Sequence, residues 1–293
     1  MKQAPLRHGL EYAGFLPLAS VLSSLGVGQA RALGRLFGAF VALLPTPWKR
    51  VARSNLQRAF PDQSPEEHAR ILQGAFRHFG GTFFEIFPLA RLSASDLCER
   101  ISWEGYEHLL AAERAGRGVI VLSAHFGCWE VIPLALGATS RPLASVGRPL
   151  DNPWADRWLQ RLRTRFGNRS LPKRGAIREM FRTLERGERL GLLLDQRVRP
   201  SEGIEVPFFG HPAWTSSLVA RLALRTGAPV VGVASYPEPR GRFRIRFEAP
   251  LTASGPNHPS STLEFTRTLL EQDARIIRGQ PELWFWFHDR WKR

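Results

Sequence analysis

The sequence has little cysteine: Cys98 and Cys128 are the two among 293 residues. Two distant cysteines build no disulfide framework and cannot complete a four-ligand zinc site, so we expect a reducing compartment and no bound metal. Several enzyme signatures are also missing, namely G-x-S-x-G, the P-loop, G-x-G-x-x-G and H-E-x-x-H. Their absence argues against a hydrolase elbow, a nucleotide fold and a metalloprotease, and we expect no cofactor.

Long apolar runs are lacking as well. The segment "GLEYAGFLPLASVLSSLGVG", residues 9–28, is interrupted by Pro17, and "LGRLFGAFVALLP" contains Arg35, so neither offers about 20 clean apolar residues. The sequence has no small-residue cleavage site at the position typical of a signal peptide, so we expect no signal peptide. Basic residues flank both segments, which favours helices that lie in a membrane interface. A helical hairpin packed on the core is the alternative.

Acidic residues are scarce relative to basic ones. Asp and Glu number 26 against 41 Lys and Arg, which gives a net charge of +15. Such a surplus predicts an anionic partner: nucleic acid, an anionic membrane surface or a phosphorylated substrate. The known nucleic-acid-binding modules and a basic–aromatic stripe are missing, so we expect no nucleic acid. Hydrophobic residues make up 43% of the chain, enough for a packed core.

The pattern of apolar residues changes near residue 96. Helices are predicted over most of 9–95, an N-terminal helical, membrane-interfacial region that we assign to residues 1–95. Beyond it, strands and helices alternate, which predicts an α/β core over 96–293 with a mixed, mostly parallel sheet flanked by helices. The expected strands are 118–123, 143–147, 190–195, 229–235 and 242–248, the last being an edge or half-exposed strand. The expected helices are 127–137, 153–166, 175–187, 213–226 and 260–278.

The stretch "GVIVLSAHFGCWE" places His125 where a buried strand ends and Glu130 five positions later. Ligands bind at this edge in open α/β sheets. On one helix the two side chains would point about 140° apart, so they meet only if the chain turns, and Gly127 suits a turn. A histidine oriented by a carboxylate is a general base for a hydroxyl. The alternative is a histidine with a purely structural role, since so short a motif is weak by itself.

Several segments together resemble one enzyme family. "SAHFGCWE" is similar to the H-x4-D/E block of the glycerolipid acyltransferase superfamily, and more closely to that of the late acyltransferases of lipid A biosynthesis. Other matching segments are "RSNLQRAFPDQSPEE", "FRHFGGTFFEIF", "VGRPLDNP", "LPKRGAIREMFRTLERGERLGLLLDQ", "GIEVPFFGHPAWTSSLVARLALRTGAPVV" and "PELWFWFHDRWK". Leu283 stands where that family often has glutamine. The resemblance covers residues 50–293, and the mycobacterial phosphatidylinositol mannoside acyltransferases share much of it.

The resemblance implies transfer of an acyl chain from an acyl thioester, acyl carrier protein being the expected donor, to a hydroxyl of a lipid A precursor, an anionic glycolipid, at the cytoplasmic face of the inner membrane. The alternative is a phosphatidylinositol mannoside or other glycolipid or lysophospholipid acyltransferase that uses acyl-CoA. His125 would be the base and Glu130 its orienting carboxylate. A thioester is already activated, so no covalent enzyme intermediate is needed. Residues expected to bind or line the substrate are Arg148, Asp195, Gln196, Phe208, Gly210 and Thr215. Phe208 and Gly210 would shape a turn and a tunnel wall, and Thr215 could equally cap a helix. A lipid-binding protein without catalysis is the other class.

Overall fold

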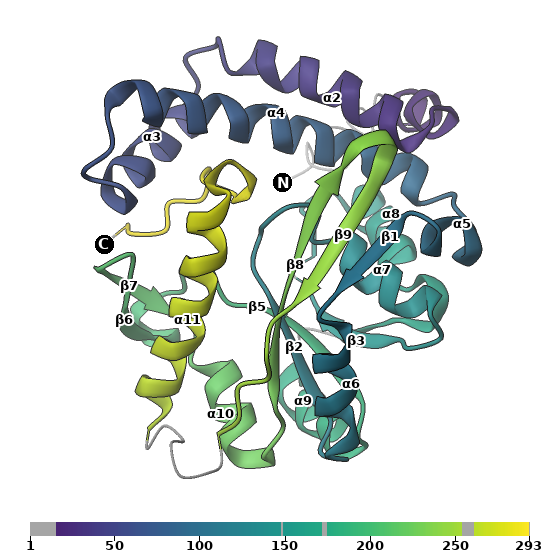
Figure 1. The fold of residues 1–293 in the computed structure, drawn as a ribbon, viewed down its shortest axis with the longest axis vertical. Helices are drawn as coiled ribbons and strands as arrows, with labels where there is room; N and C mark the ends of the chain where they lie inside the picture. Colours follow the sequence, from purple (N-terminus) through teal and green to yellow (C-terminus); the bar gives the residue numbers. More distant parts are fainter. Residues whose placement is uncertain (1–15, 148, 172–174, 254–260, 293) are drawn as a thin grey trace, which may run out of the picture.

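The computed structural model describes residues 16–147, 149–171, 175–253 and 261–292 (Figure 1). Within these ranges seven strands form one sheet in the order β1-β9-β8-β2-β5-β3-β4, and β6 and β7 form a separate hairpin. The strands are β1 (Ile101–Glu104), β2 (Val119–Ser123), β3 (Leu143–Val146), β4 (Arg169–Leu171), β5 (Arg189–Leu193), β6 (Ile204–Phe208), β7 (His211–Thr215), β8 (Val230–Glu238) and β9 (Arg242–Phe247).

Neighbouring strands of the large sheet run parallel, except β8 and β9, which run antiparallel. The mixed, mostly parallel sheet predicted from the sequence is therefore confirmed. The "RFRIRF" strand alternates exposed and buried residues, as expected, but it is not an edge strand because β1 pairs with its outer side. The sequence missed β1 and β4, which are four and three residues long.

Helices cover both faces of the sheet, and the side chains of β2 show how. Ile120 and Leu122 belong to one buried cluster with residues of α9, α10 and α11, whereas Val119 and Val121 belong to another with α6 and α7. A strand buried on both faces reads as a continuous apolar run, which is why "VIVL" was recognisable. The helices here are α6 (Tyr106–Arg114), α7 (Val131–Ala138), α8 (Pro153–Arg163), α9 (Ala176–Glu185), α10 (Leu218–Thr226) and α11 (Thr262–Gly279).

Two of these helices, α7 and α10, begin four and five residues later than predicted. Residues 127–130 form a turn, so α7 starts at Val131 and not at residue 127. The helix predicted from residue 213 starts at Leu218, because His211–Thr215 pairs with Ile204–Phe208 as the second strand of the β6–β7 hairpin. Phe209 and Gly210 connect those strands, and both have positive φ angles, as a tight hairpin turn requires.

The N-terminal helices form a layer along one end of the sheet, at the top of Figure 1. It contains α2 (Val27–Val41), α3 (Pro47–Ala59) and α4 (Pro65–Leu89), followed by α5 (Ala94–Cys98). Gly34 and Gly38 let α2 approach α4 closely: a Cβ on Gly38 would lie 2.0 Å from the carbonyl oxygen of Phe76. Within the described ranges, no helix combines the length and apolar character that crossing a bilayer requires.

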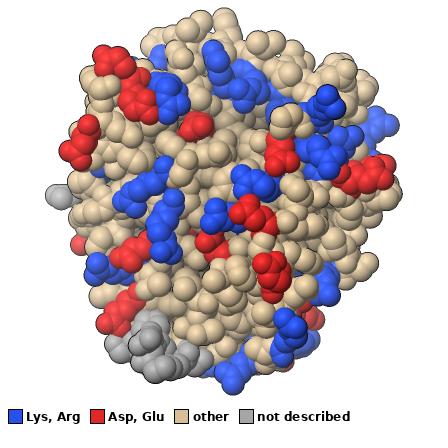
Figure 2. All heavy atoms as spheres, viewed as in Figure 1, with Lys and Arg blue, Asp and Glu red and all other residues tan. Residues whose placement is uncertain are grey.

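The outer surface of this layer is unusually apolar. Eleven of the sixteen large hydrophobic side chains that are exposed in the described residues lie between residues 16 and 83. Arginine and lysine side chains are spread over the face drawn in Figure 2, many of them beside acidic residues. The positive charge therefore forms no single large patch on that face, and the feature that sets the helical layer apart is its exposed apolar side chains.

Candidate active site

The loop between β2 and α7 carries His125 and is held from two sides. Gly127 has a φ of +59°, and a Cβ built on it would lie 1.8 Å from the carbonyl oxygen of Ser235, so only glycine fits. The C-terminal aromatic segment lies along the same loop: the backbone N–H of Phe285 donates to His125 O at 2.9 Å, and that of Gly127 donates to Leu283 O at 2.8 Å. The predicted turn at Gly127 is thus confirmed.

Asp195 is the carboxylate that orients His125. The distance between His125 Nδ1 and Asp195 Oδ1 is 2.9 Å, and the backbone N–H of His125 donates to Asp195 Oδ2 at 2.9 Å. Trp284 Nε1 donates to the same Oδ2 at 2.8 Å. Because an ionised carboxylate only accepts, the ring proton lies on Nδ1 and Nε2 is left as a proton acceptor. This tautomer is the one a general base needs.

The pair shifts the pKa of both groups. Burial opposes protonation of the His125 ring, but the charge of Asp195 and its hydrogen bond outweigh burial and raise the pKa of His125. Burial alone would raise the pKa of Asp195, whereas the facing imidazole and the donors around the carboxylate lower it to about 2. Asp195 is therefore ionised wherever His125 titrates, and its charge stabilises the imidazolium that proton transfer creates.

Gln196 lies at the second ring nitrogen of His125. Its side-chain Nε2 is 3.3 Å from His125 Nε2, and because that imidazole nitrogen accepts, the amide is the donor. His125 remains partly accessible, with 19% of its side chain exposed, while Asp195 is fully buried. Asp195 and Gln196 follow β5, the neighbour of β2, so both lie at the sheet edge predicted from the sequence.

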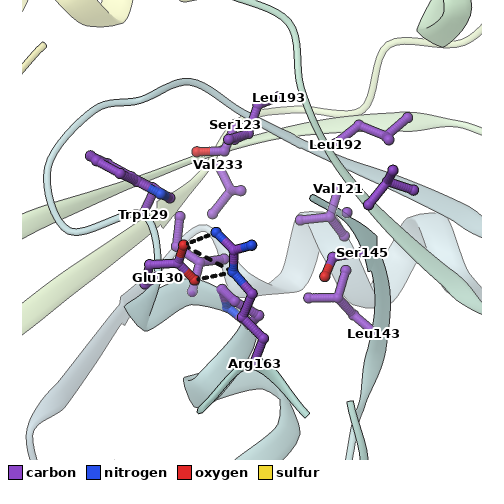
Figure 3. A pocket seen from close by; sticks show the side chains of 14 residues that line it. Val121, Ser123, Trp129, Glu130, Leu143, Ser145, Arg163, Leu192, Leu193 and Val233 are labelled. Atoms are coloured by element: carbon purple, nitrogen blue, oxygen red, sulfur yellow. Dashed lines mark hydrogen bonds and ion pairs between the residues drawn. The ribbon is translucent and has the colours of Figure 1, made fainter. Parts of the chain in front are cut away.

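Glu130 makes its hydrogen bonds with Arg163 and not with His125. Arg163 Nε lies 3.1 Å from both carboxylate oxygens of Glu130, and its Nη2 forms a further short contact (Figure 3). Glu130 precedes α7 and Arg163 ends α8, so the pair joins two helices. Glu130 acts on His125 through its charge alone, which favours the protonated ring, and the charge of Arg163 has the opposite effect.

Arg163 is a site residue that the sequence analysis missed. It lines a cavity of about 80 Å³ with Glu130, Trp129 and Ser123, between the sheet and α7 (Figure 3). A Cβ on Gly147 would lie 2.5 Å from Arg163 Nη1, so the guanidinium rests against the end of β3. The sequence around Arg163 does not distinguish it from the many other arginines of this basic chain. Its partner Glu130 lies 33 residues away, so the ion pair could not be predicted from a local pattern.

A larger apolar groove lies next to the aromatic rings that pack against His125. It has a volume of about 440 Å³, within the range of small-molecule sites. The Phe79 ring contacts Trp129 and Phe285, and both of these rings pack against His125. The groove therefore begins one ring away from the base. It is lined by Phe37, Gly38, Val41, Trp48, Phe76, Phe79, Gly80, Phe83, Phe285, Phe287 and His288.

Two buried side chains, those of His78 and Cys128, belong to or contact the loop that carries His125. His78 of α4 is 5% exposed, and burial lowers its pKa to about 3 despite a hydrogen bond with the Gly127 backbone. This second imidazole is uncharged across the range in which His125 titrates. Cys128 is fully buried, as expected of a small apolar side chain, and burial raises the pKa of its thiol well above the usual value.

The remaining predicted residues take part in other contacts or lie outside the described residues. Phe208 is buried against Trp284 and Trp291, and Gly210 is exposed at the hairpin turn. Thr215 ends β7 and accepts a hydrogen bond from Arg290 at 2.6 Å. It does not cap α10, whose N-cap is Ser217. Arg148 lies outside the described residues. No group of three or more His, Cys, Asp or Glu side chains suited to a metal ion occurs within the described part of the chain.

Comparison with known proteins identifies the family. The family model for bacterial lipid A biosynthesis acyltransferases matches residues 3–293. The chain is 26% identical to the lipid A biosynthesis lauroyltransferase of Escherichia coli over 257 residues, 83% of this chain and 78% of that protein. It is 23% identical to a lipid A biosynthesis acyltransferase of Haemophilus influenzae over 80% of this chain and 73% of that protein.

Two further similarities lie outside the lipid A enzymes. The phosphatidylinositol mannoside acyltransferase of Mycobacterium tuberculosis is 25% identical over 82% of this chain and 76% of that protein. The crystal structure of a 1-acyl-sn-glycerophosphate acyltransferase from Thermotoga maritima aligns with a TM-score of 0.40 and 17% identity, covering 87% of this chain and 98% of the other. With the family model spanning nearly all of the sequence, the chain belongs to the bacterial lipid A biosynthesis acyltransferase family and is an acyltransferase.

Proposed function

We propose that this enzyme moves a fatty acyl chain from an acyl thioester, with acyl carrier protein as donor, to a hydroxyl of a lipid A precursor. The observation that carries the proposal is the His125–Asp195 pair, in which Asp195 holds the Nδ1 proton and leaves Nε2 to accept. The similarity to lipid A acyltransferases supports the choice of acceptor.

In the proposed reaction His125 Nε2 takes the proton of the acceptor hydroxyl while its oxygen attacks the thioester carbonyl. The tetrahedral intermediate then collapses, the carbon–sulfur bond breaks, and the imidazolium returns the proton to the leaving thiolate. Asp195 stabilises the imidazolium throughout, and no covalent enzyme intermediate forms. Gln196, whose amide faces Nε2, would release that nitrogen and donate instead to an oxygen of the bound substrate.

Negative charge develops on the carbonyl oxygen and is also present on an anionic acceptor. We propose that the guanidinium of Arg163 stabilises one of these negative charges, because Glu130 holds it near His125. Arg148 keeps the same predicted role. Glu130 then contributes to catalysis through Arg163, and not as the residue that orients His125.

We further propose that the protein attaches to the cytoplasmic face of the inner membrane as a peripheral or monotopic protein. The exposed apolar side chains of α2, α3 and α4 support this, because large contiguous apolar patches on a soluble protein typically mark membrane or partner surfaces. The groove of about 440 Å³ opens through that surface, since its lining residues Phe37, Trp48 and Phe83 are among the exposed ones. A lipid substrate would reach His125 from the bilayer by this route.

Acyl transfer by the purified protein tests the proposal. Labelled acyl carrier protein and labelled acyl-CoA are each offered with a lipid A precursor, and the lipid products are analysed by mass spectrometry. We expect one added acyl chain from the carrier-protein donor and none with His125→Ala. Phosphatidylinositol mannoside is the alternative acceptor, because the chain is 25% identical to a phosphatidylinositol mannoside acyltransferase and 26% identical to a lipid A lauroyltransferase. Transfer to it and not to the lipid A precursor would overturn the proposed substrate.

A further inference from the structure

A basic pocket lies beside the start of α3, apart from the catalytic loop. It has a volume of about 390 Å³ and is lined by Pro45, Thr46, Lys49, Arg50 and Arg53. Three of these five residues are cationic, and none of the described residues that line the pocket is acidic. The local electrostatic potential of such a concave site favours an anion.

The two arginines of this pocket have no carboxylate partner among the residues that the structure describes. Arg50 and Arg53 are exposed, and neither forms an ion pair with a carboxylate among the described residues. Other arginines of the helical layer are paired, as Arg31 is with Glu85 and Arg70 with Glu67. The sequence of α3 contains no acidic residue at all. An added anion would relieve the repulsion between neighbouring cations.

These cations also do not stabilise the helix that carries them. Thr46 caps α3 and accepts from the backbone N–H of Lys49 at 3.2 Å, so Lys49 and Arg50 fall in and just after the first turn. Positive side chains near a helix N-terminus oppose the helix dipole, where acidic side chains would be favourable. Lys49 also has a structural contact, because its Nζ donates to the carbonyl oxygen of Ala42 at the end of α2. The side chains of Arg50 and Arg53 form no hydrogen bond or ion pair with the described residues, so these two cations are the ones left for a ligand.

The surroundings of the pocket identify the kind of anion. Leu43, Leu44 and Trp48 are close in sequence to its lining residues and are 73%, 41% and 61% exposed. Cations beside exposed aliphatic and tryptophan side chains match a membrane interface, where phosphate lies directly above hydrocarbon. A soluble phosphate compound or a nucleic acid would leave those apolar side chains in water.

We propose that Lys49, Arg50 and Arg53 bind the phosphate of a bilayer phospholipid, while Leu43, Leu44 and Trp48 enter its hydrocarbon. Trp48 also lines the apolar groove that leads toward His125. A phospholipid held here would fix the mouth of that groove at the bilayer surface. The inference deepens the proposed membrane attachment and rests on it. The lipid bound here is a component of the bilayer and not the acceptor substrate.

Vesicle binding without acyl donor or acceptor tests the site independently of catalysis. The full-length protein is mixed with vesicles of phosphatidylglycerol and phosphatidylcholine, and the bound fraction is measured by sedimentation. At roughly one kcal/mol per cation near anionic lipid, Arg50→Gln with Arg53→Gln should weaken binding about 30-fold. Both side chains are exposed, so melting temperature and circular dichroism should not change. Replacing both by lysine should restore most of the binding.

The matched control removes the same charge elsewhere. Arg178 and Arg221 are exposed on α9 and α10, away from the helical layer. Arg178→Gln with Arg221→Gln should weaken binding less than threefold. An equal loss of vesicle binding in this control would mean that only the net charge of the protein matters, and it would contradict the proposed phospholipid site. Unchanged vesicle binding in the Arg50/Arg53 variant, with a raised KM for the acceptor in detergent, would assign the pocket to the acceptor phosphate and also overturn the proposal.

Discussion

At the scale of single residues, the imidazole of His125 has one nitrogen committed to a carboxylate and the other open. Replacing His125 by Ala removes the proton acceptor, and general-base assistance contributes ~10²–10⁴ in rate. We expect acyl transfer to fall by at least that factor while the melting temperature changes little, since the ring lies in a loop and is partly exposed. Steady-state transfer of a labelled acyl chain measures it. A folded His125→Ala protein with near wild-type turnover would remove the mechanistic basis of the proposal.

Asp195→Asn separates the orienting role from the base itself. Asp195 accepts from three donors, so an amide nitrogen in its place must face at least one N–H group. If it faces Nδ1, the ring proton moves to Nε2 and the base is lost. We expect a large fall in kcat, no further loss when His125→Ala is added, and a lower melting temperature. Additive losses in the double variant would show that the two residues act separately.

The pH dependence follows from the direction of the His125 pKa shift. The ring is a base only when neutral, so activity falls as pH decreases through its pKa. Because Asp195 raises that pKa, the acid limb of kcat/KM should have its midpoint above about 6.5 in the wild type. In Asp195→Asn the charge is gone, and the midpoint should move to lower pH. His78 contributes nothing in this range because its pKa is about 3. An unchanged midpoint would contradict the assignment.

Glu130→Gln distinguishes the two roles considered for that carboxylate. If the role of Glu130 is to hold Arg163, the variant leaves a partly buried cation without its charged partner. Breaking a fully buried ion pair in this way costs about 3–5 kcal/mol of stability. We expect a lower melting temperature, reduced activity and a pH midpoint that falls less than in Asp195→Asn, because Glu130 favours the protonated ring through its charge alone. Arg163→Lys should also lower the melting temperature and the activity, because lysine cannot form both bonds. A midpoint shift as large as that of Asp195→Asn would restore Glu130 as the residue that orients His125.

At the scale of elements, the sequence predicted those parts of the site that depend on local patterns. Apolar runs identified β2 and β5, and their parallel order brings His125 and Asp195 to one sheet edge. The sequence did not show that Asp195 is the carboxylate bonded to His125, because Asp195 lies 70 residues away while Glu130 lies five away. Which carboxylate reaches the ring depends on the turn at Gly127 and on the start of α7 at Val131. Short strands such as β1, and the β6–β7 hairpin, gave patterns too weak to recognise.

The contact between α2 and α4 depends on glycine, and substitution there tests the helical layer. A side chain at Gly38 would collide with the backbone of Phe76 and cannot be accommodated by a rotamer change. Gly38→Val should destabilise the protein by about 1–3 kcal/mol, the usual range for overpacking, and lower the melting temperature by several degrees. Gly279→Ala is the control, because a Cβ there meets no atom within 4 Å. Equal stability of the two variants would mean that α2 does not pack tightly on α4.

At the scale of the whole molecule, the positions of the apolar surface and of His125 fit one orientation on a membrane. The apolar layer of α2, α3 and α4 lies along one end of the sheet (Figure 1), and the groove that reaches the rings around His125 opens through it. Arg31 of α2 forms an ion pair with the buried Glu85 and donates to the backbone of Arg242 at 3.2 Å, so this layer is fixed to α4 and β9. A membrane-bound layer would therefore hold the base at a set distance from the lipid.

Removing exposed apolar side chains tests this orientation. Leu36 and Phe40 of α2 are 70% and 60% exposed, so replacing both by Ser removes no buried contact that folding needs. Each side chain contributes up to about 2 kcal/mol when it enters hydrocarbon, and the double variant should bind vesicles at least tenfold more weakly. This loss should be the same for neutral and anionic vesicles and insensitive to salt, unlike a loss of basic side chains. Ile177→Ser with Leu263→Ser, which removes two side chains that are each 51% exposed elsewhere, should leave binding unchanged. If this control pair weakens binding as much as the α2 pair, the helical layer is not the membrane-facing surface.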